Sequence, residues 1–583
     1  MKEMAKKTYS KKGDAIVQLN YKAIDAGKDA IEEVAVDNSW SDLTVTATRS
    51  TTGDEHFDEF VSVINSLDGY DLPVSAFMDK LDGSMKSGVA IKEKRAIATE
   101  VPRWNKDNCI QCNNCVMVCP HATIRAFLLD EEEMANLPEN IGDDVLVPMG
   151  KDMGGLVYRI QVSPDNCVGC GLCVTECPGK KGEKALEMVS VKDELVHAPL
   201  ADYMYANVKY RDDKYPLTTA KGVGFMRPYF EVSGACGGCG ETPYYRLASQ
   251  LFGKDMMIAN ATGCSSIYSG STPSTPCAID GNGQGPAWAN SLFEDNAEFG
   301  FGMKLAENYK VGHLLRIIEE NKDACEPELK ALLEEYKERE LVPQIMTAVK
   351  ASSNEAIKEL LNHEGDMVSK SQWIIGGDGW AYDIGYGGLD HVIASNQNVN
   401  ILVLDTEVYS NTGGQSSKSS QAGSIAKFTA GGKSAAKKDL AQIAMAYGHV
   451  YVAQVAMGAN PVQTIKAFKE AEAYNGPSLI IAYSPCMEHG IKGGLANHQR
   501  QQKDAVSCGY FNLLRYDPRL EDAGKNPLQV DSKAPDFDKF KDFLLSENRF
   551  AQLLKVNPEH AEALMEKCLA DAKKRRLRLD RMA

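Results

Sequence analysis

Long hydrophobic runs are missing from this sequence: no 18 consecutive residues are apolar, although a membrane-spanning helix needs about that length. The amino-terminal residues Met1–Lys7 are basic, but no apolar core follows them, so they are not a secretory signal. Basic residues are also in deficit, with 64 Lys and Arg against 80 Asp and Glu and a net charge of −16. That balance disfavours a nucleic acid or an anionic membrane as a partner. We therefore expect a cytoplasmic protein without a membrane span.

Cysteine, by contrast, is plentiful, and half of the 16 cysteines fall in two runs of identical spacing. Each run reads C-x2-C-x2-C-x3-C-P, a pattern whose first three thiolates bind one [4Fe-4S] cluster while the fourth binds the other cluster. We expect the first cluster on Cys109, Cys112, Cys115 and Cys177. We expect the second cluster on Cys119, Cys167, Cys170 and Cys173.

Zinc sites and disulfides are the alternatives for these eight cysteines. Zinc usually takes two CxxC pairs, and a disulfide framework is typical of a small secreted domain rather than a chain of 583 residues. Iron-bound thiolates require a reducing compartment, so we expect an anaerobic cytosol. The two runs predict a protein that moves electrons.

A third cysteine group begins at Cys236 and Cys239, with Cys264 further along the chain. A CxxC pair with one distant cysteine could form a zinc site, a redox dithiol or part of an iron–sulfur site. The neighbouring glycines leave backbone N–H groups free to reach cluster sulfides. Cys486 is a candidate fourth ligand because it follows an apolar run that predicts a strand, at the edge where open α/β sheets bind ligands. Four other cysteines compete for that role but are better explained as buried thiols: Cys277, Cys325, Cys508 and Cys568.

The second half of the chain has the pattern of an α/β domain. Short runs rich in Val and Ile, separated by amphipathic stretches, predict a parallel sheet with strands at 373–375, 399–404, 449–455 and 478–483. Helices are expected over 15–36, 303–361 and 540–581, and a loop is expected at 128–155. The pattern indicates a multidomain α/β protein in five parts: 1–36, 37–100, a ferredoxin-like module at 101–193, an α/β domain at 194–520 and a helical extension at 521–583.

A glycine-rich loop with a carboxylate, Gly377-Asp378-Gly379, follows one predicted strand, and Thr406 and Val408 follow the next. Asp378 offers an anionic oxygen, while the Thr406 hydroxyl and the Val408 carbonyl offer neutral ones, and Mg²⁺ prefers such ligands together with diphosphate oxygens and water. The two glycines let backbone N–H groups approach phosphates. Gly-Asp-Gly alone could be an ordinary turn. The combination predicts a site for Mg²⁺ and a diphosphate.

Taken together, these features resemble the pyruvate:ferredoxin (flavodoxin) oxidoreductase family. The Gly-Asp-Gly pattern followed by Thr406 and Asn411 is similar to a thiamine-diphosphate signature in which Thr takes the usual Asn position. The resemblance covers essentially the whole chain and is carried by five segments: Glu93–Arg95, 234–244, 285–296, 377–388 and 409–415. It implies a two-[4Fe-4S] ferredoxin-like module placed before a parallel-sheet, thiamine-diphosphate-binding domain that holds a proximal [4Fe-4S] cluster.

The resemblance also implies roles for individual residues. The proximal cluster would be bound by Cys236, Cys239, Cys264 and Cys486. Thiamine diphosphate would contact Glu241, Cys264, Gly377, Asp378, Gly379, Trp380, Thr406, Glu407, Val408, Tyr409, Ser410 and Asn411, and Glu241 and Asn411 would be catalytic. The implied reaction converts pyruvate to acetyl-CoA and CO₂ and passes electrons to ferredoxin or flavodoxin. Another 2-oxo acid substrate and a non-catalytic electron-transfer subunit are the alternatives.

The chain departs from the family at its amino terminus. The family has three further domains before the Glu-Lys-Arg segment, which supply the pyrimidine, substrate and coenzyme A sites, and residues 1–36 look like the tail of the coenzyme A domain. We expect a split enzyme, in which a separate subunit supplies this half, assembled as a dimer of heterodimers. A shortened chain is the alternative.

Overall fold

The computed structural model describes residues 1–42, 51–139, 141–270, 273–336 and 339–583. The residues outside these ranges fall in the predicted part 37–100 (43–50), in the predicted loop 128–155 of the part 101–193 (140), and in the predicted part 194–520 (271–272 and 337–338), the last two also in the helical region predicted at 303–361. The chain forms two compact units, Met1–Asp58 and Glu59–Ala583, which are described separately. The boundaries predicted at 36, 100, 193 and 520 stay predictions.

The α-helices in the described residues of the first unit are α1 (Lys2–Tyr9) and α2 (Asp14–Asp29). The helix predicted over 15–36 is therefore confirmed up to Asp29 and wrong beyond it. Ile31 and Val34, which follow α2, are each 77% exposed. A helix in water depends on packing of its apolar face, and residues 31–36 have none to hold them in a helix.

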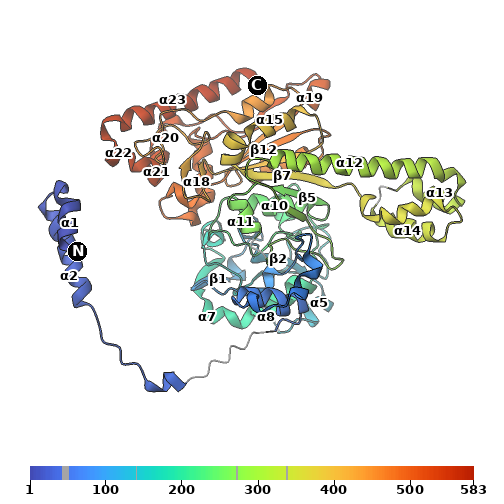
Figure 1. The fold of residues 1–583 in the computed structure, drawn as a ribbon, viewed down its shortest axis with the longest axis horizontal. Helices are drawn as coiled ribbons and strands as arrows, with labels where there is room; N and C mark the ends of the chain where they lie inside the picture. The colour runs from blue at the N-terminus through green and yellow to red at the C-terminus, as the bar shows by residue number, and fades with distance from the viewer. Residues whose placement is uncertain (43–50, 140, 271–272, 337–338) are drawn as a thin grey trace. The chain divides into compact units, whose positions relative to one another are not determined.

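The ferredoxin-like module lies in the second unit and consists of two antiparallel strand pairs (Figure 1). One pair is β1 (Glu100–Trp104) with β4 (Leu186–Ser190), and the other is β2 (Ile124–Leu129) with β3 (Val157–Val162). Short helices carry cysteines between them, α4 (Asn114–Val118) and α6 (Leu172–Thr175). Each cysteine run therefore connects a strand of one pair to a strand of the other.

The predicted loop at 128–155 was placed two residues too early. Leu128 and Leu129 end β2 and are buried, and Leu129 packs in a cluster with Leu200 and Met204 of α8 (Ala198–Asn207). The apolar run that begins at Ile124 continues to Leu129, so the strand extends as far as it can be buried. Helix α5 (Glu131–Ala135) follows, with Asp130 as its N-cap. The Asp130 side chain accepts a hydrogen bond from the Glu133 N–H in a capping box.

An eight-stranded sheet forms the centre of the second unit, in the order β14-β13-β11-β12-β8-β7-β5-β6. The six strands from β11 to β6 are parallel, and β13 pairs antiparallel with β11 on one side and with β14 on the other. Their bounds are β5 (Met256–Asn260), β6 (Ala287–Asn290), β7 (Ser371–Gly377), β8 (Asn400–Asp405), β11 (Tyr451–Val455), β12 (Ser478–Tyr483), β13 (Leu514–Tyr516) and β14 (Leu528–Val530). The four predicted strands are confirmed as β7, β8, β11 and β12.

Helices cover both faces of this sheet because successive residues of each buried strand point to opposite sides. Ile374 packs in one core with α12 (Asn296–Asn321), α15 (Tyr386–Ala394) and α16 (Leu440–Met445). Trp373 and Ile375 pack in the other core with α10 (Thr242–Phe252) and α17 (Pro461–Glu472). Each large apolar side chain buried this way contributes about 1.5–3 kcal/mol. The sheet therefore holds its strand ends rigidly.

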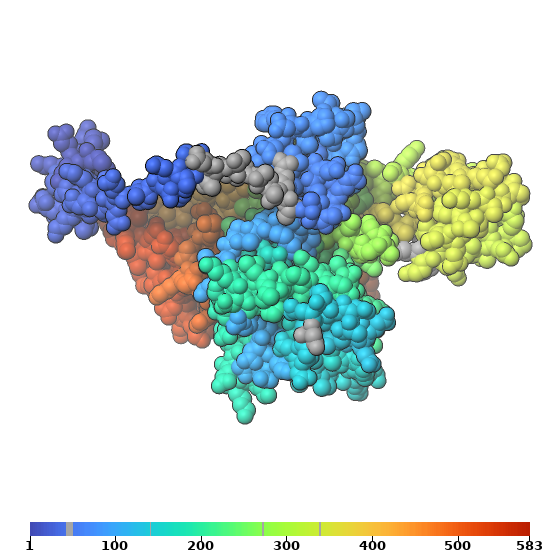
Figure 2. Space-filling view, turned by 90° about the horizontal axis from the view of Figure 1, so that it is seen from below, coloured from blue at the N-terminus to red at the C-terminus, as the bar shows by residue number. Residues whose placement is uncertain are grey.

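Two further helical regions belong to the second unit, an arm and a carboxy-terminal region. The arm (Figures 1 and 2) comprises the outer part of α12, then α13 (Pro327–Glu334), α14 (Val342–Ala351) and η11 (Ala356–Asn362). It has a small core of its own. The helical region expected at 540–581 contains α20 (Phe540–Leu545), α21 (Asn548–Ala551), α22 (Leu553–Val556) and α23 (Pro558–Met582), while α18 (His498–Ser507) and α19 (Arg519–Asp522) precede it. Both expected helical regions are thus present, each in several pieces. Of the residues described, none belong to a helix long and apolar enough to cross a membrane.

Candidate cofactor sites

The predicted site residues lie at the carboxyl ends of parallel strands, the edge at which open α/β sheets bind ligands. Cys264 begins α11 (Cys264–Ser269) after β5, Asp378 follows β7 and Thr406 follows β8. Cys486 follows β12. The sheet order places β5, β7, β8 and β12 side by side, so residues separated by more than two hundred positions meet at one edge.

A cavity of about 180 Å³ opens at this edge and is the candidate cofactor site. It is lined by ten of the twelve expected contacts: Glu241, Cys264, Gly377, Asp378, Gly379, Trp380, Val408, Tyr409, Ser410 and Asn411. It is also lined by Thr262, Gly263, Ser265, Phe293 and Thr412, which the sequence analysis missed. They flank Cys264 or Asn411 in the sequence or lie in the 285–296 segment, so these sequence neighbours could have indicated them.

The three expected Mg²⁺ ligands lie together: Asp378 and Val408 line this cavity, and Thr406, which does not line it, contacts both. The Thr406 Oγ1 atom is 3.0 Å from Asp378 Oδ1 and 3.0 Å from the Val408 carbonyl oxygen. Asp378 is only 1% exposed, and its burial, followed by the charge of Asp405, raises its pKa well above the usual value. A divalent cation bound to these oxygens would compensate the buried negative charge. This donor set fits Mg²⁺.

The two glycines beside Asp378 have different roles. A Cβ atom at Gly379 would lie 2.7 Å from Cε1 of Tyr409, so only glycine fits under that ring. A Cβ atom at Gly377 would meet nothing closer than 3.9 Å, which leaves its backbone accessible from the cavity. A phosphate can therefore approach the main chain at Gly377, as the Gly-Asp-Gly pattern predicts.

Glu407 does not line the cavity, because its carboxylate is held in a buried ionic network on the opposite side of the loop. Lys437 Nζ lies 2.9 Å from Glu407 Oε1, and Arg549 Nη2 lies 2.8 Å from Oε2. Tyr510 also donates to Oε2. These partners lower the pKa of Glu407 although burial opposes this. The direct cofactor contact expected for the Glu407 side chain therefore has no geometric support.

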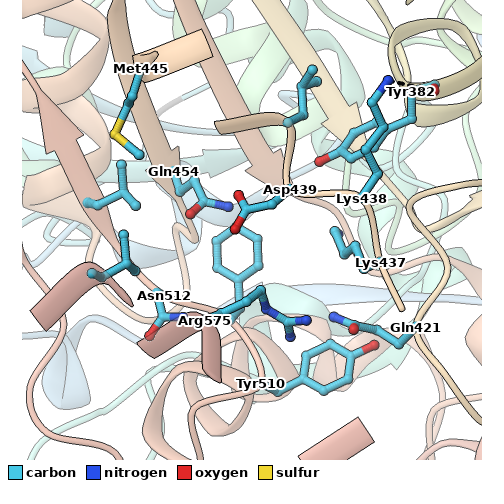
Figure 3. Close-up of a pocket in the computed structure, with 14 residues that line it drawn as sticks. Tyr382, Gln421, Lys437, Lys438, Asp439, Met445, Gln454, Tyr510, Asn512 and Arg575 are labelled. Carbon is cyan, nitrogen blue, oxygen red and sulfur yellow. Dashed lines mark hydrogen bonds between the residues drawn. The ribbon is translucent and has the colours of Figure 1, made fainter. Parts of the chain in front are cut away.

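Two members of this network, Lys437 and Tyr510, are drawn with their surroundings in Figure 3. Lys437 and Tyr510 border a second, much smaller cavity of about 30 Å³, together with Gln421 and Arg575. Lys437 also contacts Asp405 at 2.6 Å, so it links the acidic residues on either side of Thr406. Glu407 has a φ of +59°, a left-handed conformation that is unfavourable for a residue with a side chain. The network holds this turn in place and so fixes Thr406 and Val408.

A third cavity, as large as the cofactor cavity at about 180 Å³, is lined by all four cysteines expected for the proximal cluster, Cys236, Cys239, Cys264 and Cys486. Burial raises the pKa of the Cys486 thiol, and the nearby charges of Glu241 and Cys264 raise it further. None of the four competing cysteines line this cavity. The proximal set therefore fits an iron–sulfur cluster, with Cys486 as its fourth member.

Glu241 lies between the two cavities and lines both. It is 4% exposed, its Oε2 atom has no hydrogen-bond partner, and burial raises its pKa to about 7. A buried polar atom without a partner is costly, so its position at a cavity wall indicates a ligand that completes its bonding.

The eight cysteines of the ferredoxin-like module are grouped across the two runs. Cys109, Cys112, Cys115 and Cys177 line one cavity. The pKa of Cys167 is raised to about 12, by burial first and then by the charges of Cys119 and Cys170, and Cys119 also acts on Cys173. Cys177 thus joins the first run and Cys119 the second, which is the exchange that two-cluster ferredoxins make.

Zinc fits these groups less well than a cluster. A single Zn²⁺ bound at 2.3 Å holds its sulfur ligands about 3.8 Å apart. Throughout the described parts of the chain, no three cysteine sulfurs lie within 4.8 Å of one another. A four-iron cluster is larger than a single zinc ion and holds its cysteine sulfurs further apart.

The proximal loop packs directly against one of the two module groups. A Cβ atom at Gly237 would lie 3.4 Å from Cβ of Cys170. Burial raises the pKa of Cys170 to about 11, while hydrogen bonds from the N–H groups of Leu172 and Gly238 act in the opposite direction. The group containing Cys119 and Cys170 is therefore adjacent to the proximal site.

Comparison with known families agrees with both halves of this arrangement. Residues 108–181 match the 4Fe-4S dicluster domain, and residues 348–482 match the carboxy-terminal TPP-binding domain of thiamine pyrophosphate enzymes. The chain therefore combines a dicluster iron–sulfur domain with a thiamine-diphosphate-binding domain.

More particularly, the chain is homologous along nearly its whole length to pyruvate:ferredoxin and pyruvate-flavodoxin oxidoreductases. It is 48% identical to the pyruvate:ferredoxin oxidoreductase of Moorella thermoacetica, over 99% of this chain and 50% of that protein. It is 45% identical to the pyruvate-flavodoxin oxidoreductase of Klebsiella pneumoniae, over 100% of this chain and 50% of that protein. A mitochondrial pyruvate dehydrogenase [NADP(+)] of Euglena gracilis is 44% identical over 95% of this chain and 31% of its own length. The chain spans about half the length of the first two relatives.

Proposed function

We propose that this chain is the thiamine-diphosphate and iron–sulfur half of a pyruvate:ferredoxin or pyruvate:flavodoxin oxidoreductase. The reaction is the oxidative decarboxylation of pyruvate, with coenzyme A, to acetyl-CoA and CO₂. The electrons leave through three [4Fe-4S] clusters. A second polypeptide supplies the remaining contacts, in a dimer of heterodimers.

The observation that supports this proposal is the shared wall of the two large cavities. Glu241, Cys264 and Asn411 line both the cofactor cavity and the cavity of the proximal cysteines. A cofactor bound in the first would lie directly beside a cluster bound in the second, which is what transfer of electrons from one to the other requires. The contact between Gly237 and Cys170 continues this route into the ferredoxin-like module.

The residues of the chain have binding and orienting roles. Thiamine diphosphate, when bound, supplies the carbon nucleophile and the electron sink for decarboxylation. Asp378, Thr406 and the Val408 carbonyl hold its diphosphate through Mg²⁺. Glu241 offers a buried carboxyl group to the cofactor, and Asn411, at the cavity rim, helps to position the substrate.

The electron acceptor is ferredoxin or flavodoxin, as the names of the relatives suggest, and the enzyme works in the cytoplasm, where cluster thiolates stay reduced. Reduction of a viologen dye by the protein isolated anaerobically from its native cells tests the proposal. We expect reduction that needs both pyruvate and coenzyme A, that co-elutes with a second polypeptide, and that is lost when this chain is purified alone. Full iron and thiamine content without pyruvate-dependent reduction would exclude pyruvate and direct the assay to other 2-oxo acids.

A further inference from the structure

The arm formed by α12, α13, α14 and η11 carries a group of side chains of the kinds that bind metals, and none of them line the two cofactor cavities. The arm has its own core, which includes Leu314, Ile345 and Leu360. His313 lies on α12 where the chain leaves the sheet domain, and Glu359 and His363 lie at the end of η11 where it returns. The group therefore brings together residues from the two ends of the segment 313–363, which forms the arm.

The donor atoms of this group are close enough to share one ion. One ligand atom from each of His313, Glu359 and His363 lies within 4.8 Å of the other two, and no other such triad occurs within the described ranges. His313 Nε2 is 3.1 Å from Glu359 Oε1, and the two imidazole rings have their centres 5.2 Å apart. Ligands of a tetrahedral Zn²⁺ at 2.0–2.2 Å lie about 3.5 Å apart, so small side-chain rotations would complete the site.

A fourth residue orients one of these ligands. His363 Nδ1 lies 3.2 Å from Asp366 Oδ2, and a proton donated there leaves the Nε2 lone pair free. Metal-binding histidines usually make such a bond to a carboxylate through their second nitrogen. The side chains of His313 and Glu359 are 31% and 51% exposed, which gives an ion access from solvent.

The geometry points to a site for a late first-row divalent cation, with Zn²⁺ as the best match, on His313, Glu359 and His363. Two imidazole nitrogens and one carboxylate are a donor set that zinc takes with water in the fourth position. Bound zinc would fasten α12 to the end of η11 and stabilise the small core between them. This site is separate from the proposed function and does not depend on it.

Two positively charged side chains lie beside this group and would repel a bound cation. Arg316 Nη2 is 3.4 Å from His313 Nδ1, and Lys310 Nζ is 3.6 Å from Asp366 Oδ1. Zinc binding through His313 Nε2 requires the hydrogen on Nδ1, so Arg316 has to turn away. Removing the Arg316 charge is therefore expected to strengthen zinc binding, which is the opposite of what a damaged fold would do.

The test measures zinc bound by the full-length, cluster-loaded protein under anaerobic conditions. Protein incubated with Zn²⁺ alone is gel-filtered, and metal content is determined by mass spectrometry. We expect the wild type to retain one more zinc per chain than His363→Asn or Glu359→Gln, since zinc on cysteines would be equal in all three. We expect Asp366→Asn to weaken binding about 10- to 100-fold and Arg316→Gln to strengthen it.

His197→Asn is the matched control, because His197 Nδ1 is 2.8 Å from Glu139 Oε1 in a histidine–carboxylate pair without a second histidine. This variant should keep the wild-type zinc content. Hydrogen exchange gives a second readout, in which zinc should slow exchange in peptides of α12 and η11 in the wild type but not in His363→Asn. Equal zinc content in the wild type and His363→Asn, or weaker binding by Arg316→Gln, would overturn the inference.

Discussion

The ferredoxin-like module and the α/β domain bind their cofactors in different ways. In the module, two short runs of fixed spacing supply all eight cysteines, and only the fourth cysteine of each run is exchanged. In the α/β domain, Cys264, Asp378 and Cys486 come from separate loops that the sheet order brings together. Sites of the first kind depend mainly on local spacing, and sites of the second kind depend on the entire sheet.

The two regions nevertheless meet at the proximal loop. His121 of the module hydrogen-bonds through Nε2 to the Ala235 carbonyl at 3.0 Å. His498 of the α/β domain hydrogen-bonds through Nδ1 to the Gly238 carbonyl at 2.7 Å. Both histidines are buried. Each region thus fixes one end of the loop that carries Cys236 and Cys239.

The largest expected effect is the loss of iron when the fourth cysteine of a run is replaced. Cys177→Ser should remove the cluster shared with Cys109, a loss of about four iron atoms per chain. Because the two residues bind one cluster, Cys109→Ser/Cys177→Ser should lose no more than that. Cys167→Ser/Cys177→Ser should instead lose about eight. Iron analysis of anaerobically prepared protein measures this, and the opposite ranking of the two double variants would show that each run binds its own cluster.

An intermediate effect is expected at the buried network behind the Mg²⁺ loop. Glu407→Gln removes the charge that Lys437 and Arg549 hold, and the turn that positions Thr406 and Val408 should loosen. We expect Mg²⁺-dependent binding of thiamine diphosphate to weaken about 10- to 100-fold, measured from the fluorescence of Trp380 in the cavity wall.

The control for this variant is Glu470→Gln, which breaks a comparable ion pair, with Arg515 at 2.9 Å, away from the cofactor cavity. Both variants should lower the melting temperature, but only Glu407→Gln should change Mg²⁺ affinity. Equal affinities in the two variants would mean that Glu407 stabilises the fold without positioning the cofactor loop.

The smallest expected effect is the pH dependence of the two histidines. Burial lowers the pKa of His121 and of His498 to about 4, below the unfolded value of about 6.5. The unfolded chain therefore binds more protons between these values, so the free energy of unfolding should fall as pH drops from 6.5 towards 4. The expected slope is about 1.4 kcal/mol per pH unit for each histidine.

Denaturant unfolding of the wild type, His121→Asn and His498→Asn across this pH range measures the slope. Each single variant should reduce the slope by the contribution of one histidine. This should hold for His121 of the module and for His498 of the α/β domain. A slope that changes in only one variant would show that a single region holds the proximal loop.

The sequence by itself determined the two four-cysteine runs, the four strands of the parallel sheet and the Gly-Asp-Gly loop, because these depend on local spacing and periodicity. It also placed Asp378, Thr406 and Val408 in one site, since parallel strands present their carboxyl ends at one edge. Only the tertiary structure decided that Glu407 does not line the cofactor cavity, because its partners Lys437, Tyr510 and Arg549 lie far along the chain. The same holds for His121, His498 and the zinc-binding group on the arm, whose positions depend on contacts between distant segments that no local pattern encodes.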